Sequence, residues 1–269
     1  MRTSQLGPLF AFGFLFFVTT VHGQQSPAIP TAPARDDQAI AVLQSTVKAM
    51  GGAVPSDSTA TGTVTETVGS DSETGTIQIL TRGSSESLET ISLPELSQTT
   101  VYSSGLAGQS SGSAAQQQLS GQLAVTSQTI LNPLPFLAAV LINPDTSLQY
   151  VGQEAVDGMT TQHIRLWNTF YSKPHLQALA PFSVHDVWID AATGLPVKVS
   201  FTRQAAGGQA FKTLVEFRFS NYQQSGGFSY PSQITESLNG TLWLTISIQS
   251  MSVNTGLQDI QFQVNCNNN

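Results

Sequence analysis

The sequence has few charged residues, and basic ones are the scarcest. Charged side chains make up 10% of the 269 residues, against roughly a quarter in an ordinary globular domain. The 10 Lys and Arg are outnumbered by 17 Asp and Glu, so the net charge is -7 at pH 7. Such a chain lacks the positive surface that phosphate binding requires. No nucleic acid is therefore expected among its partners.

Cysteine is nearly absent as well, and this limits how the fold is held together. The one cysteine, Cys266, lies in the polar run 265–269, which we expect to form a tail. A single thiol forms no disulfide within the chain, so packing alone must stabilise the domain. No base adjoins the thiol in the sequence, and no reactive role is predicted for it.

Long apolar runs are also rare, and the main one is at the N-terminus. Residues 1–23 combine Arg2, an apolar stretch from Leu9 to Val18 and a small-residue end at Val21-His22-Gly23, which is typical of a cleaved signal peptide. The alternative, a membrane anchor, needs a stretch of roughly 20 apolar residues. We expect an exported protein, periplasmic or secreted, that is not an integral membrane protein after leader removal.

Motifs for metal binding and catalysis are weak. The histidines beyond the leader, His163, His175 and His185, have none of the spacings of zinc sites, so no metal and no cofactor is predicted. Residues 108–112 match the nucleophile-elbow pattern around Ser110, but that motif belongs to a parallel sheet. We interpret the segment as a Gly/Ser-rich loop and predict no catalytic residue. A serine hydrolase using Ser110 remains the least favoured of three functions.

The residues that are present predict one helix and then many strands. After a Pro-rich linker over 24–35, apolar residues recur at helical spacing between a capping Asp36 or Asp37 and a stop at Gly51-Gly52. From Thr61 the apolar period changes to two, which is typical of strands. The predicted strands are 61–68, 76–79, 85–93, 99–103, 148–156, 161–167, 183–190, 196–203, 213–222, 230–238 and 241–253.

Short turns join these strands and predict antiparallel neighbours. Asn239-Gly240 lies between two alternating runs and is a strong hairpin signal. In the last strand, Leu242, Leu244, Ile246 and Ile248 share a face until the phase slips, which predicts a bulge near Gln249-Ser250.

A helical insertion is predicted near 114–142. Leu119, Leu123, Thr126 and Ile130 recur at helical spacing until Pro133, and a second apolar helical piece covers 136–142. An apolar sheet face needs a cover, and the two helical regions supply it. The predicted fold class is mainly β with helices (α+β): one domain, 36–264, forms a curved antiparallel sheet or incomplete β-barrel covered by the N-terminal helix and the insertion.

Three segments resemble the LolA/LolB/RseB-like superfamily of periplasmic lipoprotein-carrier proteins. Residues 40–52 look like its first helix with the Gly-Gly end, and 187–199 look like its hairpin in which a Trp-x-Asp strand turns into a Leu-Pro strand. Residues 228–262, with Tyr230-Pro231 and Asn254, look like its closing strands. The resemblance implies an incomplete barrel with a helical lid over an apolar cavity for acyl chains. No ligand-contacting motif matches, so no binding residue is carried over.

The favoured function is an exported non-enzymatic protein that binds an apolar ligand, a lipid or lipoprotein acyl chain, between sheet and helices. The second hypothesis is an envelope interaction or assembly module that binds a protein partner and fills the cavity with its own side chains. A cavity of several hundred Å³ would favour the first. Candidate cavity residues, for which core packing is the alternative, are Phe136, Leu137, Val140, Leu141, Trp188, Phe217 and Phe219.

Overall fold

The computed structural model describes residues 32–204 and 212–264. The leader, most of the Pro-rich linker and Cys266 lie outside these residues. Within them the end of the linker follows an edge of the sheet, since Asp36 N donates to Leu148 O at 3.0 Å and Leu148 N donates to Ala34 O at 2.8 Å. The Arg35 guanidinium donates to Leu141 O at 2.8 Å.

The predicted opening helix is present as α1 (Asp37–Ala49). Asp36 caps it, because one carboxylate oxygen accepts from Gln38 N at 2.8 Å and from Ala39 N at 3.1 Å. Its apolar side faces the sheet, and Leu43 is fully buried. The helix ends at Met50, before the predicted Gly-Gly stop, where Gly51 has a φ of 131°.

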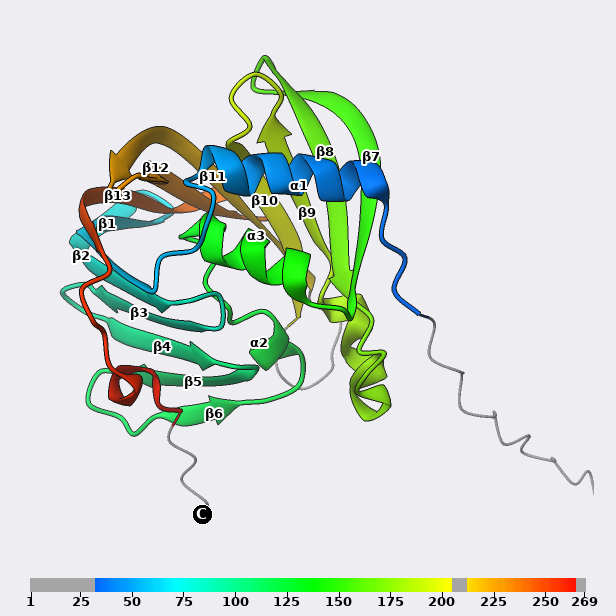
Figure 1. The fold of residues 1–269 in the computed structure, drawn as a ribbon. Coiled ribbons are helices and arrows are strands. Elements are labelled where there is room, and N and C mark those ends of the chain that lie inside the picture. The colour runs from blue at the N-terminus through cyan, green and yellow to red at the C-terminus, as the bar shows by residue number, and fades with distance from the viewer. Residues whose placement is uncertain (1–31, 205–211, 265–269) are drawn as a thin grey trace, which may run out of the picture.

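The remainder is dominated by one antiparallel sheet, curved and not closed into a barrel, as predicted (Figure 1). Within the described residues it has 13 strands, in the order β6-β5-β4-β3-β2-β1-β13-β12-β11-β10-β9-β8-β7. The strands are β1 (Asp57–Val68), β2 (Asp71–Arg82), β3 (Glu86–Ser92), β4 (Ser97–Ser103), β5 (Leu106–Ser111), β6 (Gln117–Leu119), β7 (Thr146–Val156), β8 (Met159–Asn168), β9 (His185–Asp190), β10 (Pro196–Gln204), β11 (Lys212–Ser225), β12 (Phe228–Leu238) and β13 (Thr241–Val253).

This strand order explains where the helical insertion lies. Strands β6 and β7 are consecutive in the chain but occupy opposite edges of the sheet. Their connection must therefore cross the sheet, and it carries α2 (Gln122–Val125) and α3 (Pro133–Ile142). Figure 1 shows α1 and α3 on the same side of the curved sheet, with α2 beside β5 and β6. Two 3-10 helices, η1 (Pro174–Phe182) and η2 (Asp259–Phe262), complete the described elements.

The chain over 103–142 differs from the prediction in three places. The segment 103–113, predicted as a loop, contains strand β5, because its small residues pair with β4 along their whole length. The helix predicted from Leu119 to Ile130 is reduced to the four residues of α2. Pro133 begins α3 instead of ending a helix, since proline is well tolerated in the first helical turn, where its missing N–H costs nothing.

The main core lies between the concave face of the sheet and helices α1 and α3. Leu43 of α1 and Leu137 of α3 are fully buried there. They pack with the inward residues of strands from both halves of the sheet, among them Val64, Ile164 and Ile246. Burial of this contiguous apolar surface is the main source of stability in a chain without disulfides among its described residues.

Two bulges shape the last strand. The predicted one is confirmed, because the register with β1 skips Gln249. A second bulge was not predicted: Glu236 pairs with Leu244 and Ser237 with Leu242, so Trp243 is the extra residue. Leu242 therefore leaves the face it was predicted to share with Leu244 and is 42% exposed.

At the first bulge, the backbones of β1 and β13 come too close at Gly62 to leave room for a side chain. A Cβ on Gly62 would lie 2.0 Å from Ser247 O and 2.9 Å from Ile248 Cα, both backbone atoms. We expect Gly62→Ala to lower the free energy of unfolding by about 2 to 3 kcal/mol, as overpacking does.

Chemical denaturation of Gly62→Ala beside Gly108→Ala checks this expectation. Gly108 is also within a strand, but its added Cβ would meet only the end of the flexible Gln116 side chain. An equal, small effect of both changes would show that the close approach is not required.

Candidate functional site

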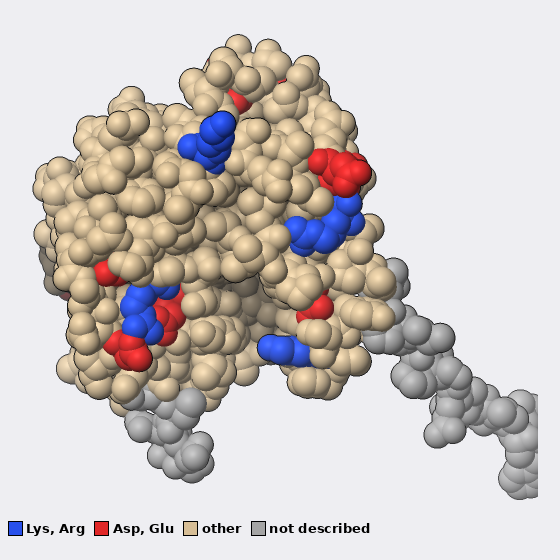
Figure 2. Space-filling view, in the orientation of Figure 1, with Lys and Arg blue, Asp and Glu red and all other residues tan. Residues whose placement is uncertain are grey.

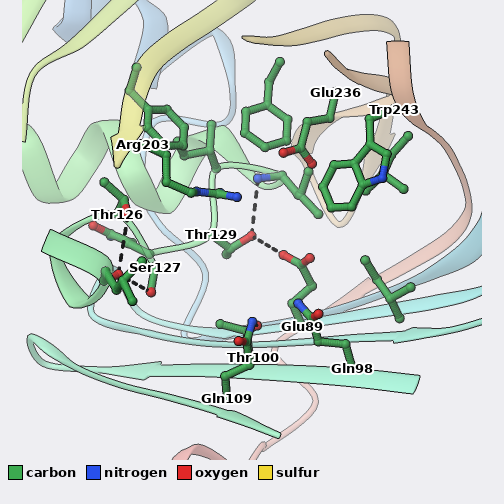
Figure 3. A pocket seen from close by; sticks show the side chains of 18 of the residues that line it. Glu89, Gln98, Thr100, Gln109, Thr126, Ser127, Thr129, Arg203, Glu236 and Trp243 are labelled. Carbon is green, nitrogen blue, oxygen red and sulfur yellow. Dashed lines mark hydrogen bonds between the residues drawn. The ribbon is translucent and has the colours of Figure 1, made fainter. Parts of the chain in front are cut away.

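The candidate site is a cavity of about 290 Å³ beside the filled core, between the concave sheet face and the chain around α2. Figure 3 shows polar side chains from both sides pointing into it. Its lining residues are Glu89, Ile91, Gln98, Thr100, Gln109, Leu119, Leu123, Thr126, Ser127, Gln128, Thr129, Ile130, Leu131, Phe201, Arg203, Phe217, Glu236, Trp243, Leu244 and Ile246.

The floor of the cavity follows from strand register. Glu89 of β3 pairs with Thr100 of β4, which pairs with Gln109 of β5. Directly paired residues project from the same face of a sheet, so these three form one polar row across the strands. The Gln109 amide donates to Thr100 Oγ1 at 3.4 Å. The row thus presents polar groups to the cavity.

The opposite wall comes from the second half of the sheet. Glu236 of β12 pairs with Phe217 of β11 on one side and with Leu244 of β13 on the other. The Trp243 side chain, at the bulge of β13, also lines the cavity. Its indole N–H donates to Glu66 Oε1 at 2.8 Å. This wall combines a carboxylate with large apolar surfaces.

The cover is the segment 126–131, which continues from α2. Thr129 Oγ1 donates to Glu89 Oε2 at 3.3 Å and accepts from Leu131 N at 3.3 Å. The Gln128 amide donates to Ser84 O at 3.3 Å. These bonds attach the segment 126–131 to the strand side of the cavity and hold its apolar residues, Ile130 and Leu131, inward.

Three charged residues line the cavity. Arg203 points into the space between Glu236 on one side and Glu89 on the other (Figure 3). Burial raises the pKa of Glu236 to about 7, with Arg203 opposing and Glu89 adding to the shift. Burial also raises the pKa of Glu89, against the Thr129 hydroxyl and Arg203. Glu236 Oε1 is buried with no hydrogen-bond partner among the described residues.

The residues predicted to line a cavity are distributed over three places. Phe217 lines the cavity. Phe136, Leu137, Val140 and Phe219 are buried in the main core, and Leu141 packs against it half-buried. Trp188 lies on the convex face with Val156 and Val197. The structure therefore brings Phe217 alone of these seven to the cavity wall.

The convex-face surroundings of Trp188 are polar and well paired. His163 stacks on the indole at 4.4 Å between ring centroids, and its Nε2 lies 2.7 Å from Asp186 Oδ1. Its Nδ1 lies 2.9 Å from Glu154 Oε1, and the Lys198 ammonium lies 3.6 Å from the Trp188 ring centroid. These contacts satisfy one another, which indicates a structural network on this face.

The other residues considered for chemistry are separated. His185 is buried beside Phe136 and Phe201, and burial lowers its pKa to about 4. It points away from its neighbour Asp186, as expected on a strand. Ser110 lies within β5, paired with Thr99, so the strand-to-helix turn of a nucleophile elbow is not formed there. Over residues 32–204 and 212–264, no group of three or more His, Cys, Asp or Glu side chains is placed to hold a metal ion.

The surface is sparsely charged. In Figure 2 most of the visible face is uncharged, and some of the few Lys and Arg lie beside Asp or Glu.

None of the helices in the described part of the chain has the length and apolar character needed to span a membrane.

Comparison with known proteins adds a fold assignment. No protein-family model matches the chain, and no curated protein sequence does. Among solved structures, one match is a Vibrio parahaemolyticus domain described as an outer membrane lipoprotein-sorting protein domain. The TM-score is 0.56 at 13% sequence identity, and the match covers 84% of this chain and 97% of the other. A DUF1329 family protein from Desulfovibrio piger matches with a TM-score of 0.56 at 12% identity, over 85% of this chain and 98% of its own.

A third solved structure carries the family name that the sequence motifs suggested. It is a LolA superfamily protein from Nitrosomonas europaea, with a TM-score of 0.55 at 15% identity, covering 84% of this chain and 97% of its own. At such low identity these likenesses concern the fold. The resemblance expected from the sequence is confirmed at that level: this chain has the fold of the LolA superfamily.

Proposed function

We propose that this chain is an exported, non-enzymatic protein that binds an apolar or amphipathic ligand, such as a lipid or a lipoprotein acyl chain, in the cavity beside α2. The cavity of about 290 Å³ is the observation that carries the proposal. Small-molecule sites have volumes of roughly 300–1,000 Å³, so this one is near the lower end of the range. It suits a short apolar body or part of a longer chain.

The chemistry of the lining supports the same proposal. Binding sites for small molecules are mainly apolar with a few well-placed polar groups. Here Phe201, Phe217, Leu244 and Ile246 supply apolar surface, while ten of the twenty lining residues are polar or charged, so the lining suits an amphipathic ligand better than a purely apolar one. An interaction module with a completely filled interior is the rival hypothesis, and a cavity of about 290 Å³ disfavours it.

Native mass spectrometry of protein exported and purified without detergent tests the proposal. A co-purifying small molecule in the spectrum, released on unfolding, is the expected result. A single mass equal to the polypeptide, together with no uptake of added aliphatic ligand, would favour the interaction module.

A substitution that fills the cavity gives a second test. Thr100 is half-buried on the cavity floor, and Thr100→Trp should abolish binding of 1-octanol, because the indole would occupy the space. Its neighbour Thr99 projects from the opposite face, where its hydroxyl lies 3.3 Å from that of Thr90. Thr99→Trp is the matched control and should leave binding unchanged. Calorimetric titration of both variants measures the difference, and equal binding by both would place the ligand elsewhere.

A further inference from the structure

Among the described residues, Glu236 carries the one fully buried side-chain oxygen or nitrogen that has no hydrogen-bond partner. Its side chain is carried on the central strand β12 and is 5% exposed overall. Its Oε1 has no hydrogen-bond partner, while Figure 3 shows the carboxylate pointing into the cavity. A buried carboxylate oxygen left unpaired costs free energy that a bound donor would recover.

The charges around this carboxylate do not cancel. The charged side chains that line the cavity are Glu89 from β3, Arg203 from β10 and Glu236 itself. When both carboxyl groups have lost their protons, two negative charges face one positive charge. Glu89 already accepts from Thr129 at 3.3 Å. Glu89 thus has a hydrogen-bond donor within the structure, and the buried carboxyl oxygen left without one is Glu236 Oε1.

We propose that the cavity selects an amphiphile whose polar end is a primary ammonium group, which donates to Glu236 while the apolar body packs on Phe217 and Leu244. This inference rests on the proposed function, since it names the ligand class for the same cavity. An ammonium supplies three donors and one positive charge. It thus donates a hydrogen bond to the unpaired Glu236 oxygen and also balances the second negative charge of the two ionised carboxylates.

Other polar ends fit the cavity less well. A hydroxyl donates one hydrogen bond but leaves the excess charge in place. A carboxylate adds a third negative charge beside Arg203, and buried carboxylates that share a site hold a proton between them. Its binding would then weaken as the pH rises. An amine shows the opposite dependence, because Glu236 must lose its proton to pair with the ammonium.

The experiment compares three probes with the same eight-carbon chain: 1-octylamine, 1-octanol and octanoate, each titrated into the full chain by calorimetry. At pH 8 the amine should bind most tightly. Lowering the pH to 5.5 should weaken its binding by about thirtyfold, since the ammonium then competes with a proton on Glu236, whose pKa is about 7. Octanol binding should change little over the same range.

Glu236→Gln identifies the responsible residue. It should weaken octylamine binding at pH 8 by about thirtyfold, the effect of removing one partner from a buried charge pair. It should also remove the pH dependence, while an unchanged far-UV circular dichroism spectrum shows that the variant is still folded. Glu95 is exposed in the turn between β3 and β4, so Glu95→Gln is the control with the same charge change and no expected effect.

The outcomes distinguish failure of the ammonium assignment from failure of the proposed function. Octanol or octanoate binding as tightly as octylamine at pH 8 overturns the ammonium assignment and leaves the cavity as an apolar binding site. An octylamine preference that survives in Glu236→Gln also overturns the role of Glu236. Absence of binding by all three probes overturns the proposed function itself and, with it, this inference.

Discussion

Replacing Leu137 by Asp is expected to lower the free energy of unfolding by about 4 kcal/mol or more. Leu137 is fully buried in α3, within the main core between the helices and the sheet. Leu137 packs among the apolar residues of this core, so the new carboxylate would be placed in an apolar environment. The loss should appear in thermal or urea unfolding.

The matched control lies on the same helix. Ile142 is the last residue of α3 and is 73% exposed. Ile142→Asp introduces the same carboxylate at a solvated position, where its main cost is the unfavourable interaction with the helix C-terminus, about 1 kcal/mol or less. If Leu137→Asp proved as mild as this control and instead reduced octanol binding, α3 would be a movable lid and not part of the core.

The second large effect is expected on the pH dependence of stability, through Glu236. Its pKa is about 7 in the folded protein, against an unfolded value of about 4.3. A carboxyl whose pKa is raised by folding binds its proton more tightly in the native state. Its contribution to stability is complete below the unfolded pKa and is lost as the pH rises towards 7. The loss amounts to roughly 3 kcal/mol, while Glu89 shifts in the same direction.

Comparison with Glu236→Gln isolates this contribution. The amide is neutral at every pH and has nearly the same shape, so the variant should be more stable than the parent at pH 8 by roughly 3 kcal/mol. Near pH 4 the two should be equally stable. Denaturation curves at both pH values measure the difference. A variant less stable than its parent at pH 8 would mean that the ionised carboxylate has a stabilising partner in the protein.

The sequence predicts the fold well because its signals are local. Helix α1 has its capping Asp36, and Asn239-Gly240 takes positive φ values of 50° and 81° in the turn between β12 and β13. Strand β5 was missed, since Gly108, Ser110 and Ser111 have weak strand propensity and gain their structure by pairing with β4.

The cavity was less predictable than the sheet. Phe136, Leu137 and Val140 of α3 are buried in the core, but burial in a core and contact with a ligand produce the same apolar pattern. Glu89 and Glu236 carried a usable signal: each is a carboxylate at an inward position of a strand, where an apolar residue is expected. Which inward carboxylates face one another depends on register across the whole sheet, which no single segment of the sequence specifies.

The pairing of β1 with β13 has a consequence for the order of folding. Within the described residues it is the one neighbouring pair in the sheet whose strands are not consecutive in the chain. Each meander on either side forms from short hairpins, which close quickly, whereas joining the two requires a contact across most of the sequence. Glu89 belongs to the first meander, while Arg203 and Glu236 belong to the second. The cavity therefore needs both meanders, joined by the β1–β13 pairing, and we expect an isolated half to lack it.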